Sequence, residues 1–296
     1  MSVAAARKTP GPRTPKTRPI VTGRRASRGA QVSFWIGAGW LTVLVLLAAG
    51  ADVLPIAPYD RMVGAPLQPP GLTEPFGTDE IGRSVFSRVI YGARTSLVVG
   101  TVASVIGVVL GGLLGLVAGY FRGIIETLVD ILAEVVQAFP ALLFLVAMAA
   151  VVRPSLSTLT ISLAVLMVPA FARMTKGAVL AQANREFVFA ARALGAGHAR
   201  VLFREILPNT VMSLVSFAIV VMALMIVIEG SVSYLGYGIP LPSPSWGGMA
   251  AESEARFATH PHLVLVPVLF LFATVYALNA VGDHLRRRFD VGQSQL

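Results

Sequence analysis

The segment FAARALGAGHARVLFREILPN, residues 189–209, interrupts a strongly apolar chain with arginines, small residues and a proline. Apolar residues recur at helical spacing over residues 186–194, and the Gly-Ala-Gly break that follows can adopt backbone angles that end a helix. Residues 198–206 predict a second helix, after which Pro208 is suited to begin the next one. The pattern therefore predicts a shaped helix-turn-helix that docks into a partner, with an amphipathic hairpin lying on the membrane surface as the alternative.

The composition of the whole chain indicates a membrane protein. Apolar residues make up 55% of the 296 positions and charged residues 13%, against about 25% charged residues in soluble domains. A soluble core could not cover so much apolar surface, so the expected surroundings are lipid. The chain contains no cysteine, which excludes disulfides and thiolate metal sites but leaves the compartment open.

Six apolar runs are long enough to be membrane spans, and they predict an all-α, polytopic membrane protein. The runs cover 34–51, 96–121, 125–151, 156–173, 210–234 and 263–283. We expect Pro140, Pro169 and Pro267 to kink the helices that contain them. The first run has a possible signal-peptide cleavage site at Ala51, but its length favours a retained helix.

The basic residues decide the predicted orientation. Eight of the 24 lie in the first 31 positions, with no acid among them, and the Pro-rich composition there predicts disorder. With a cytoplasmic N-terminus, 18 basic residues lie inside and six outside, as the positive-inside rule requires. Both termini are then cytoplasmic.

The net charge of +9 is interpreted as setting the orientation of the chain in the membrane, in preference to forming a lipid-binding or nucleic-acid-binding arm. No nucleic-acid partner is therefore expected.

These features divide the chain into parts. The expected parts are a disordered basic tail (1–31), the first span with an extracytoplasmic segment (32–95), a five-helix core (96–285) with a cytoplasmic loop (174–208), and a cytoplasmic C-terminal tail (286–296). Within the extracytoplasmic segment, Asp79 and Arg83 are four residues apart. That spacing predicts an ion pair that stabilises a short helix, with contact to a partner protein as the alternative.

Four glycines in the second span recur every four residues: Gly107, Gly111, Gly115 and Gly119. This spacing places them on one helix face, where small side chains let a neighbouring helix approach closely in a membrane. We expect them to pack against another helix, with a pore-lining role as the alternative.

Ionisable residues inside spans are candidates for function. Asp130 and Glu134 share one helix face near the cytoplasmic end of the third span, without an obvious counter-charge in that helix. They predict a structural or gating role near the inner mouth of a pathway, in preference to a proton relay. Glu229 follows Asn209 by 20 residues, about 30 Å along a helix. It is therefore expected near the outer surface, either lining an outer cavity or exposed at the interface.

Other chemistry-bearing residues predict no catalytic or metal site. His260 and His262 lack a third ligand nearby, so no metal site is expected. Trp246 is interpreted as an anchor at the membrane interface. The sequence contains no GxxxxGK[ST] phosphate-binding motif and no nucleophile-base set, so any ATP is expected to be handled by another chain.

The opening segment resembles the EAA loop of ABC importer permeases, whose coupling helix sits in a cleft of the cytoplasmic ATPase. Phe189 stands where that family most frequently has glutamate, and there an aromatic anchor could fill a pocket in place of a salt bridge. The residues expected to carry the coupling are Phe189, Ala190, Ala191, Arg192, Gly195, His198, Ile206 and Pro208.

Three further segments narrow the resemblance to the second permease of dipeptide, oligopeptide and nickel importers. PFGTDEIGRSVFSRVIYGARTSL (75–97), SYLGYGIPLPSPSWGGMAAE (233–252) and LNAVGDHLRRRFD (278–290) are similar to segments of that group in the same order. In the third span, Ile131 replaces the arginine that the group often carries.

This resemblance implies an inner-membrane subunit with the type I ABC importer permease fold, forming half of an ATP-driven pathway for dipeptides or oligopeptides. It also implies a heterodimer with a homologous permease, two ATPases that bind ATP and Mg²⁺, an extracytoplasmic solute-binding protein, and no cofactor in this chain. The alternatives are import of nickel or another small solute, and an ion-coupled secondary transporter.

Overall fold

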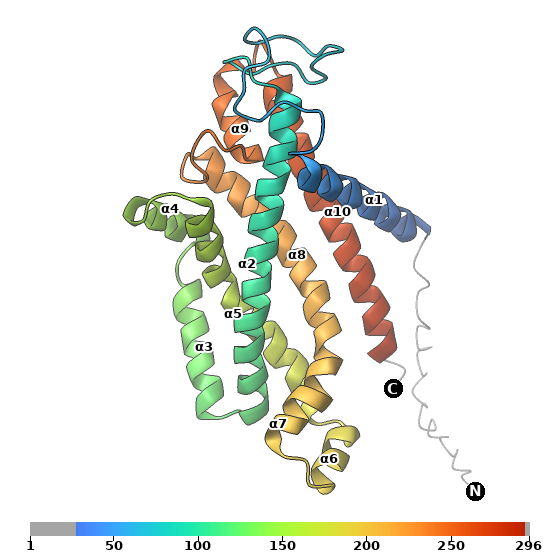
Figure 1. Ribbon diagram of the computed structural model, residues 1–296. Helices are drawn as coiled ribbons and strands as arrows, with labels where there is room; N and C mark the ends of the chain where they lie inside the picture. Colours follow the sequence, from blue (N-terminus) through green and yellow to red (C-terminus); the bar gives the residue numbers. More distant parts are fainter. Residues whose placement is uncertain (1–27, 294–296) are drawn as a thin grey trace, which may run out of the picture.

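The computed structural model describes residues 28–293, and over that range its regular elements are helices, with two isolated β-bridges in the segment before the second helix (Figure 1). The elements are α1 (Arg28–Gly50), α2 (Val85–Phe121), α3 (Ile124–Gln137), α4 (Ala141–Val151), α5 (Leu156–Ala183), α6 (Glu186–Ala193), α7 (His198–Arg200), a π-helical turn (Val201–Ile206), α8 (Leu207–Tyr234), α9 (Trp246–Glu252), a 3-10 turn (Glu254–Arg256) and α10 (His262–Gln293).

Within the described residues, five helices are long and apolar enough to cross a membrane. They are Gly29–Gly50, Val85–Phe121, Leu156–Ala183, His198–Tyr234 and His262–Arg288. The sixth expected span is a bent pair, because α3 and α4 meet at an angle of 76°. Pro140 lies between them and adopts φ −56° and ψ 128°. Proline lacks a backbone N–H and disfavours helix in the residue before it, so the expected kink is a full break.

Two helices begin earlier than hydropathy predicted. Residues 28–31, expected in the disordered tail, form the first turn of α1, and residues 1–27 lie outside the described residues. α2 begins at Val85, not at residue 96, because the Ser84 side chain caps the helix by accepting a hydrogen bond from the backbone N–H of Ser87. Such a cap satisfies one of the free donors of the first turn.

Two other helices end later than expected. α5 continues from residue 173 to Ala183, because Val179, Gln182 and Ala183 keep one face of the helix buried although the mean hydropathy falls. Pro169 stays inside this helix. Residues 286–293, expected as a tail, continue α10. The loop expected over 174–208 is therefore mostly helical.

α2 and α8 run through the length of the molecule, and α5 packs along α2 (Figure 1). The central core joins α2, α5 and α8 through fully buried residues such as Val99, Leu163, Phe171 and Met225. A second core packs α1, α9 and α10 against the outer halves of α2 and α8. The third lies at the opposite end of the bundle, under α6 and the π-helical turn. This last core holds the polar hairpin of the opening segment in place.

Candidate functional site

The hairpin of residues 186–206 has a shape determined by one glycine. α6 ends at Ala193, and Gly195 adopts φ +83°, a conformation that residues with a Cβ rarely occupy. Two hydrogen bonds close the turn: Gly195 N–H donates to Arg192 O (2.9 Å) and Ala196 N–H donates to Ala191 O (3.0 Å). The chain then reverses into α7. Of the sequence-predicted coupling residues, Gly195 is thus the one that forms the turn.

The inner face of the hairpin is anchored to the bundle. Val188, Val201 and Ile206 are fully buried against Leu116 of α2 and Val179 of α5. Burial of each aliphatic side chain contributes about 1.5–3 kcal/mol. The hairpin is therefore a fixed projection from the ends of α2 and α5.

The outer face of the hairpin exposes large apolar side chains among charged ones. The Phe189 side chain is 55% exposed and Leu194 at the turn is 88% exposed. Ala190 and Arg192 are also exposed, and Ala191 is half-buried. Exposed large apolar side chains on a fixed projection mark a surface that another protein or a membrane covers.

Tyr120, which was not predicted from the sequence, joins both halves of the hairpin. The Tyr120 hydroxyl lies 2.9 Å from His198 Nδ1, and the Arg192 guanidinium carbon lies 5.2 Å from the centre of the Tyr120 ring. A cation over an aromatic face is attractive. Tyr120 is the next-to-last residue of α2, and nothing in its local sequence points to these two distant partners.

Pro208 lies in the first turn of α8, as expected, and the π-helical turn before it joins the second half of the hairpin directly to this membrane span. Residues His198–Tyr234 form one helix of 37 residues. The π-helical turn Val201–Ile206 directly precedes the proline, and its wider winding accommodates the missing N–H. Pro208 itself is exposed.

The four glycines of α2 that recur every four residues all face α5. A Cβ at Gly107, Gly111, Gly115 or Gly119 would lie 3.0 Å or less from Phe171, Val168 O, Ala172 O or Lys176 O respectively. At Gly111, Gly115 and Gly119 the obstructing atoms include carbonyl oxygens of the α5 backbone, which cannot move aside as a side chain can. The two helices therefore touch backbone to backbone.

The acidic residues of α3 separate into two environments. Lys176 of α5 places Nζ 2.8 Å from both Asp130 carboxylate oxygens and 3.2 Å from Glu126 Oε1. Asp130 thus has a counter-charge, supplied by another helix. Glu134 is exposed and lies outside this cluster. The structure does not bring Asp130 and Glu134 together with Glu229.

Glu229 is fully buried, so it is not exposed at the interface. The hydroxyl of Ser96 in α2 donates to Glu229 Oε2, and that of Ser233 donates to Oε1, each at 2.8 Å. Buried polar groups require such partners. The expectation of exposure at the interface is therefore wrong, because distance along α8 says nothing about which helix covers this residue. A place along an outer cavity stays a prediction.

Trp246 is also fully buried and does not act as an interface anchor. Its indole N–H donates to Val89 O at 3.1 Å. The ring lies on α2 at Gly92, where an added Cβ would lie 3.3 Å from Trp246 Cδ1, a tight contact. α9 is thereby fixed to α2.

A buried network of charges fastens the segment before α2. Arg83 Nε lies 2.6 Å from Asp79 Oδ2, as the spacing predicted, but the pair sits in a turn and not in the expected helix. Arg88 of α2 bonds both Asp79 and Glu252 of α9, and Arg83 also reaches Glu252 Oε2 at 2.8 Å. The segment is thus tied to two helices.

The charges of this network set the ionisation of Asp79. Burial alone would raise the pKa of the Asp79 carboxyl. Hydrogen bonds from Arg83 and the positive charges of Arg83 and Arg88 outweigh that effect and hold the pKa below its usual range. Asp79 is therefore ionised at neutral pH, and its charge is compensated by two arginines.

Solved structures of known transporters share this fold. The MetNI methionine ABC transporter in an inward facing conformation has a TM-score of 0.56 at 19% identity, covering 68% of this chain and 96% of that chain. An amino acid ABC transporter with histidines has a TM-score of 0.54 at 18% identity, covering 69% and 94%. These similarities are to the fold alone, and they confirm the expected all-helical permease architecture.

Sequence comparison extends the similarity. The glutathione transport system permease protein GsiD of Shigella dysenteriae serotype 1 is 39% identical over 254 residues, 84% of each chain. The protein of that name from Salmonella typhimurium is 39% identical over 259 residues, 86% of this chain and 85% of that one. Residues 111–292, which contain the hairpin, the α5 contacts and Glu229, match the family described as binding-protein-dependent transport system inner membrane component. The chain belongs to this family of permease subunits of ABC importers.

Proposed function

We propose that this permease forms half of a pathway that imports short peptides, with a homologous second permease as the other half. Its curated relatives are named as glutathione permeases, and glutathione is itself a tripeptide. A dipeptide or oligopeptide has the same chemical features, a charged amine and carboxylates on an amide backbone. The proposed substrate class is therefore short peptides, delivered by an extracytoplasmic solute-binding protein.

The hairpin of residues 186–206 is proposed as the docking site for the two ATPase subunits, which bind ATP and Mg²⁺. The observation that carries this proposal is the difference in burial between the two faces of the hairpin. Val188, Val201 and Ile206 are buried in the bundle, whereas Phe189 and Leu194 are exposed. Large apolar side chains in the centre of an interface are typical anchors. This placement requires the hairpin, and with it both chain ends, to face the cytoplasm of a bacterial inner membrane.

The continuity of α7 with α8 suggests how movement is transmitted. Because His198–Tyr234 is one helix, displacement of the hairpin by closing ATPases acts directly on a spanning helix that packs against α2 and α10. Backbone contact between α2 and α5 keeps those two helices together. The proposed motion is a rigid-body rotation of the packed helices between inward and outward access.

A matched pair of glycines tests the docking proposal. Gly195→Val places a β-branched residue at φ +83°, whereas Gly197→Val places the same residue at φ −69°, and a Cβ meets nothing within 4 Å at either position. Only Gly195→Val is strained, by about 1–2 kcal/mol or more. We expect it to insert into the membrane but to lose co-purification of the ATPases and uptake of a labelled dipeptide. Gly197→Val should retain both.

Phe189→Ala and Leu194→Ala separate docking from turn geometry. Both side chains are exposed, so their truncation leaves the fold intact. We expect weaker attachment of the ATPases, by at least 1 kcal/mol for a central anchor. Full attachment and uptake in both variants, together with equal behaviour of the two glycine variants, would refute the docking site. The solutes retained by the purified binding protein test the substrate class separately.

A further inference from the structure

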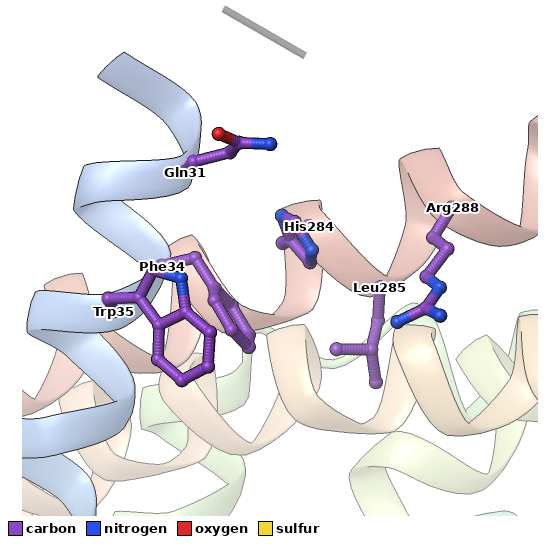
Figure 2. A pocket seen from close by; sticks show the side chains of 6 residues that line it. All are labelled: Gln31, Phe34, Trp35, His284, Leu285 and Arg288. Atoms are coloured by element: carbon purple, nitrogen blue, oxygen red, sulfur yellow. The ribbon is translucent and has the colours of Figure 1, made fainter. Parts of the chain in front are cut away.

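An open groove lies between the start of α1 and the end of α10. Its volume is about 700 Å³, and Figure 2 shows the six side chains that line it, three from each helix. They are Gln31, Phe34, Trp35, His284, Leu285 and Arg288. None of them belongs to the hairpin, the glycine contacts or the charge network.

Most of the groove wall is apolar, with polar groups at its ends. The Phe34 and His284 rings stack with centroids 4.2 Å apart and form the floor between the helices. Trp35 is 72% exposed and borders the groove on the α1 side. Arg288 lies at the α10 end and Gln31 at the α1 end (Figure 2). The groove therefore offers a long apolar contact ending in a cation and an amide.

The groove lies at one face of the membrane. α1 runs antiparallel to α10, since Gly37 packs on Ala277 and the Trp40 indole N–H donates to Thr274 Oγ1 at 3.1 Å. His284 follows the first residue of α10 by 22 positions, about 33 Å along the helix, which is the thickness of the hydrocarbon core. The apolar wall thus meets the headgroup region at Arg288.

The charge at this face is positive. Arg287 and Arg288 are exposed beside the groove, and no residue in the described part of the chain forms an ion pair with the Arg288 guanidinium. Basic pockets between membrane helices on the cytoplasmic side are suited to anionic lipid headgroups. Tryptophan at the same depth is typical of the membrane interface.

We propose that this groove binds one anionic phospholipid of the cytoplasmic leaflet, with its phosphate on Arg288 and an acyl chain along Leu285, Phe34 and Trp35. The choice of leaflet rests on the orientation in the proposed function. The bound lipid would fill the space between α1 and α10 and keep the first span against the bundle.

The test uses the detergent-solubilised transporter, titrated with phosphatidylglycerol or with phosphatidylcholine, and native mass spectrometry to count the bound lipid. We expect a preference for phosphatidylglycerol. Arg288→Gln should reduce phosphatidylglycerol retention about fivefold, since one arginine near an anionic headgroup contributes roughly that factor, and should leave phosphatidylcholine retention unchanged. Arg287→Gln, an exposed neighbour outside the lining, is the matched control and should lose little.

Trp35→Ala tests the apolar wall, and we expect it to weaken retention of both lipids. Equal retention of the two lipids by the unaltered transporter would overturn the proposal. Equal losses in Arg287→Gln and Arg288→Gln would also overturn it, because they would indicate a diffuse basic surface. Displacement of all lipid when the second permease is present would show that the partner protein occupies the groove. If the transporter shows no lipid preference while the ATPases still co-purify, the lipid site is wrong and the proposed function stands. If the unaltered protein prefers phosphatidylglycerol but does not co-purify with the ATPases, the proposed function is wrong and the lipid site stands.

Discussion

Arg88 Nη2 lies 2.8 Å from Glu252 Oε1, and this contact joins residues 164 positions apart in the chain. Arg88 is 2% exposed, and its other terminal nitrogen lies 2.8 Å from Asp79 Oδ2. One arginine of α2 thus holds the preceding segment and α9 at the same point. One carboxylate comes from the segment before α2 and the other from α9, so this end of the protein is built around the Arg88 guanidinium.

Removal of Arg88 should loosen the outer end of the molecule. Arg88→Met leaves Asp79 and Glu252 short of a counter-charge, and breaking a buried ion pair on one side costs about 3 kcal/mol or more. We expect a lower free energy of unfolding and faster protease cleavage within residues 53–83. Arg94→Met is the control, because its pair with Asp52 is exposed and is expected to contribute at most about 1 kcal/mol. Equal effects of the two substitutions would contradict the central role of Arg88.

The depressed pKa of Asp79 predicts how this attachment depends on pH. A carboxyl whose pKa is lower in the folded state contributes stability above its unfolded pKa, about 3.9, and that stability is lost as the pH falls through the lower folded value. We therefore expect cleavage within residues 53–83 to stay slow down to about pH 4 and to increase below it. Asp79→Asn should be cleaved faster at neutral pH and should lack the Asp79-dependent part of the acid transition. An unchanged acid transition in that variant would contradict the assignment.

Adjacent glycines in α2 should respond differently to the same substitution. At Gly111 an added Cβ would lie within 3.0 Å of α5 backbone atoms, whereas at Gly112 it would lie 3.4 Å from a Leu214 methyl group, an ordinary contact. Gly111→Ala is expected to destabilise the permease by about 1–3 kcal/mol through overpacking. Gly112→Ala should be neutral or stabilising by up to about 1 kcal/mol, because alanine favours helix. Thermal unfolding of both purified variants measures the difference, and similar melting temperatures would exclude close α2–α5 contact.

Lys176 should hold α3 against α5. Lys176→Met removes the cation shared by Asp130 and Glu126, whose side chains are 36% and 31% exposed. Because water screens this cluster, the expected loss is only about 1 kcal/mol. Hydrogen exchange of α3 amides should become faster in this variant and stay unchanged in Glu134→Gln, which alters an exposed acid on the same helix. Faster exchange in both would assign the effect to the charge of α3 itself.

The sequence by itself determined the class of the fold, because hydropathy and helix breaks are local properties. Five of the six apolar runs coincide with part or all of a spanning helix, and the sixth coincides with the bent pair α3 and α4. The turn at Gly195 was also visible, since a Gly-Ala-Gly break between two amphipathic segments needs no distant partner. The four-residue spacing of the α2 glycines determined that one face is smooth, but not that α5 covers it.

Only the tertiary structure decided which polar residues are buried. Hydropathy placed residues 85–95 outside the membrane helices, and distance along the helix placed Glu229 near a surface. Residues 85–95 instead belong to α2, whose Arg88 is buried with carboxylates of distant segments, and Glu229 is buried between hydroxyls of α2 and α8. Burial of a charged or polar side chain by itself costs free energy, and a hydrogen-bonding or ionic partner offsets most of that cost. One partner of Arg88, Glu252, lies 164 residues away, so no window of neighbouring residues contains this pairing, and packing of α2 against α8 and α9 supplies it.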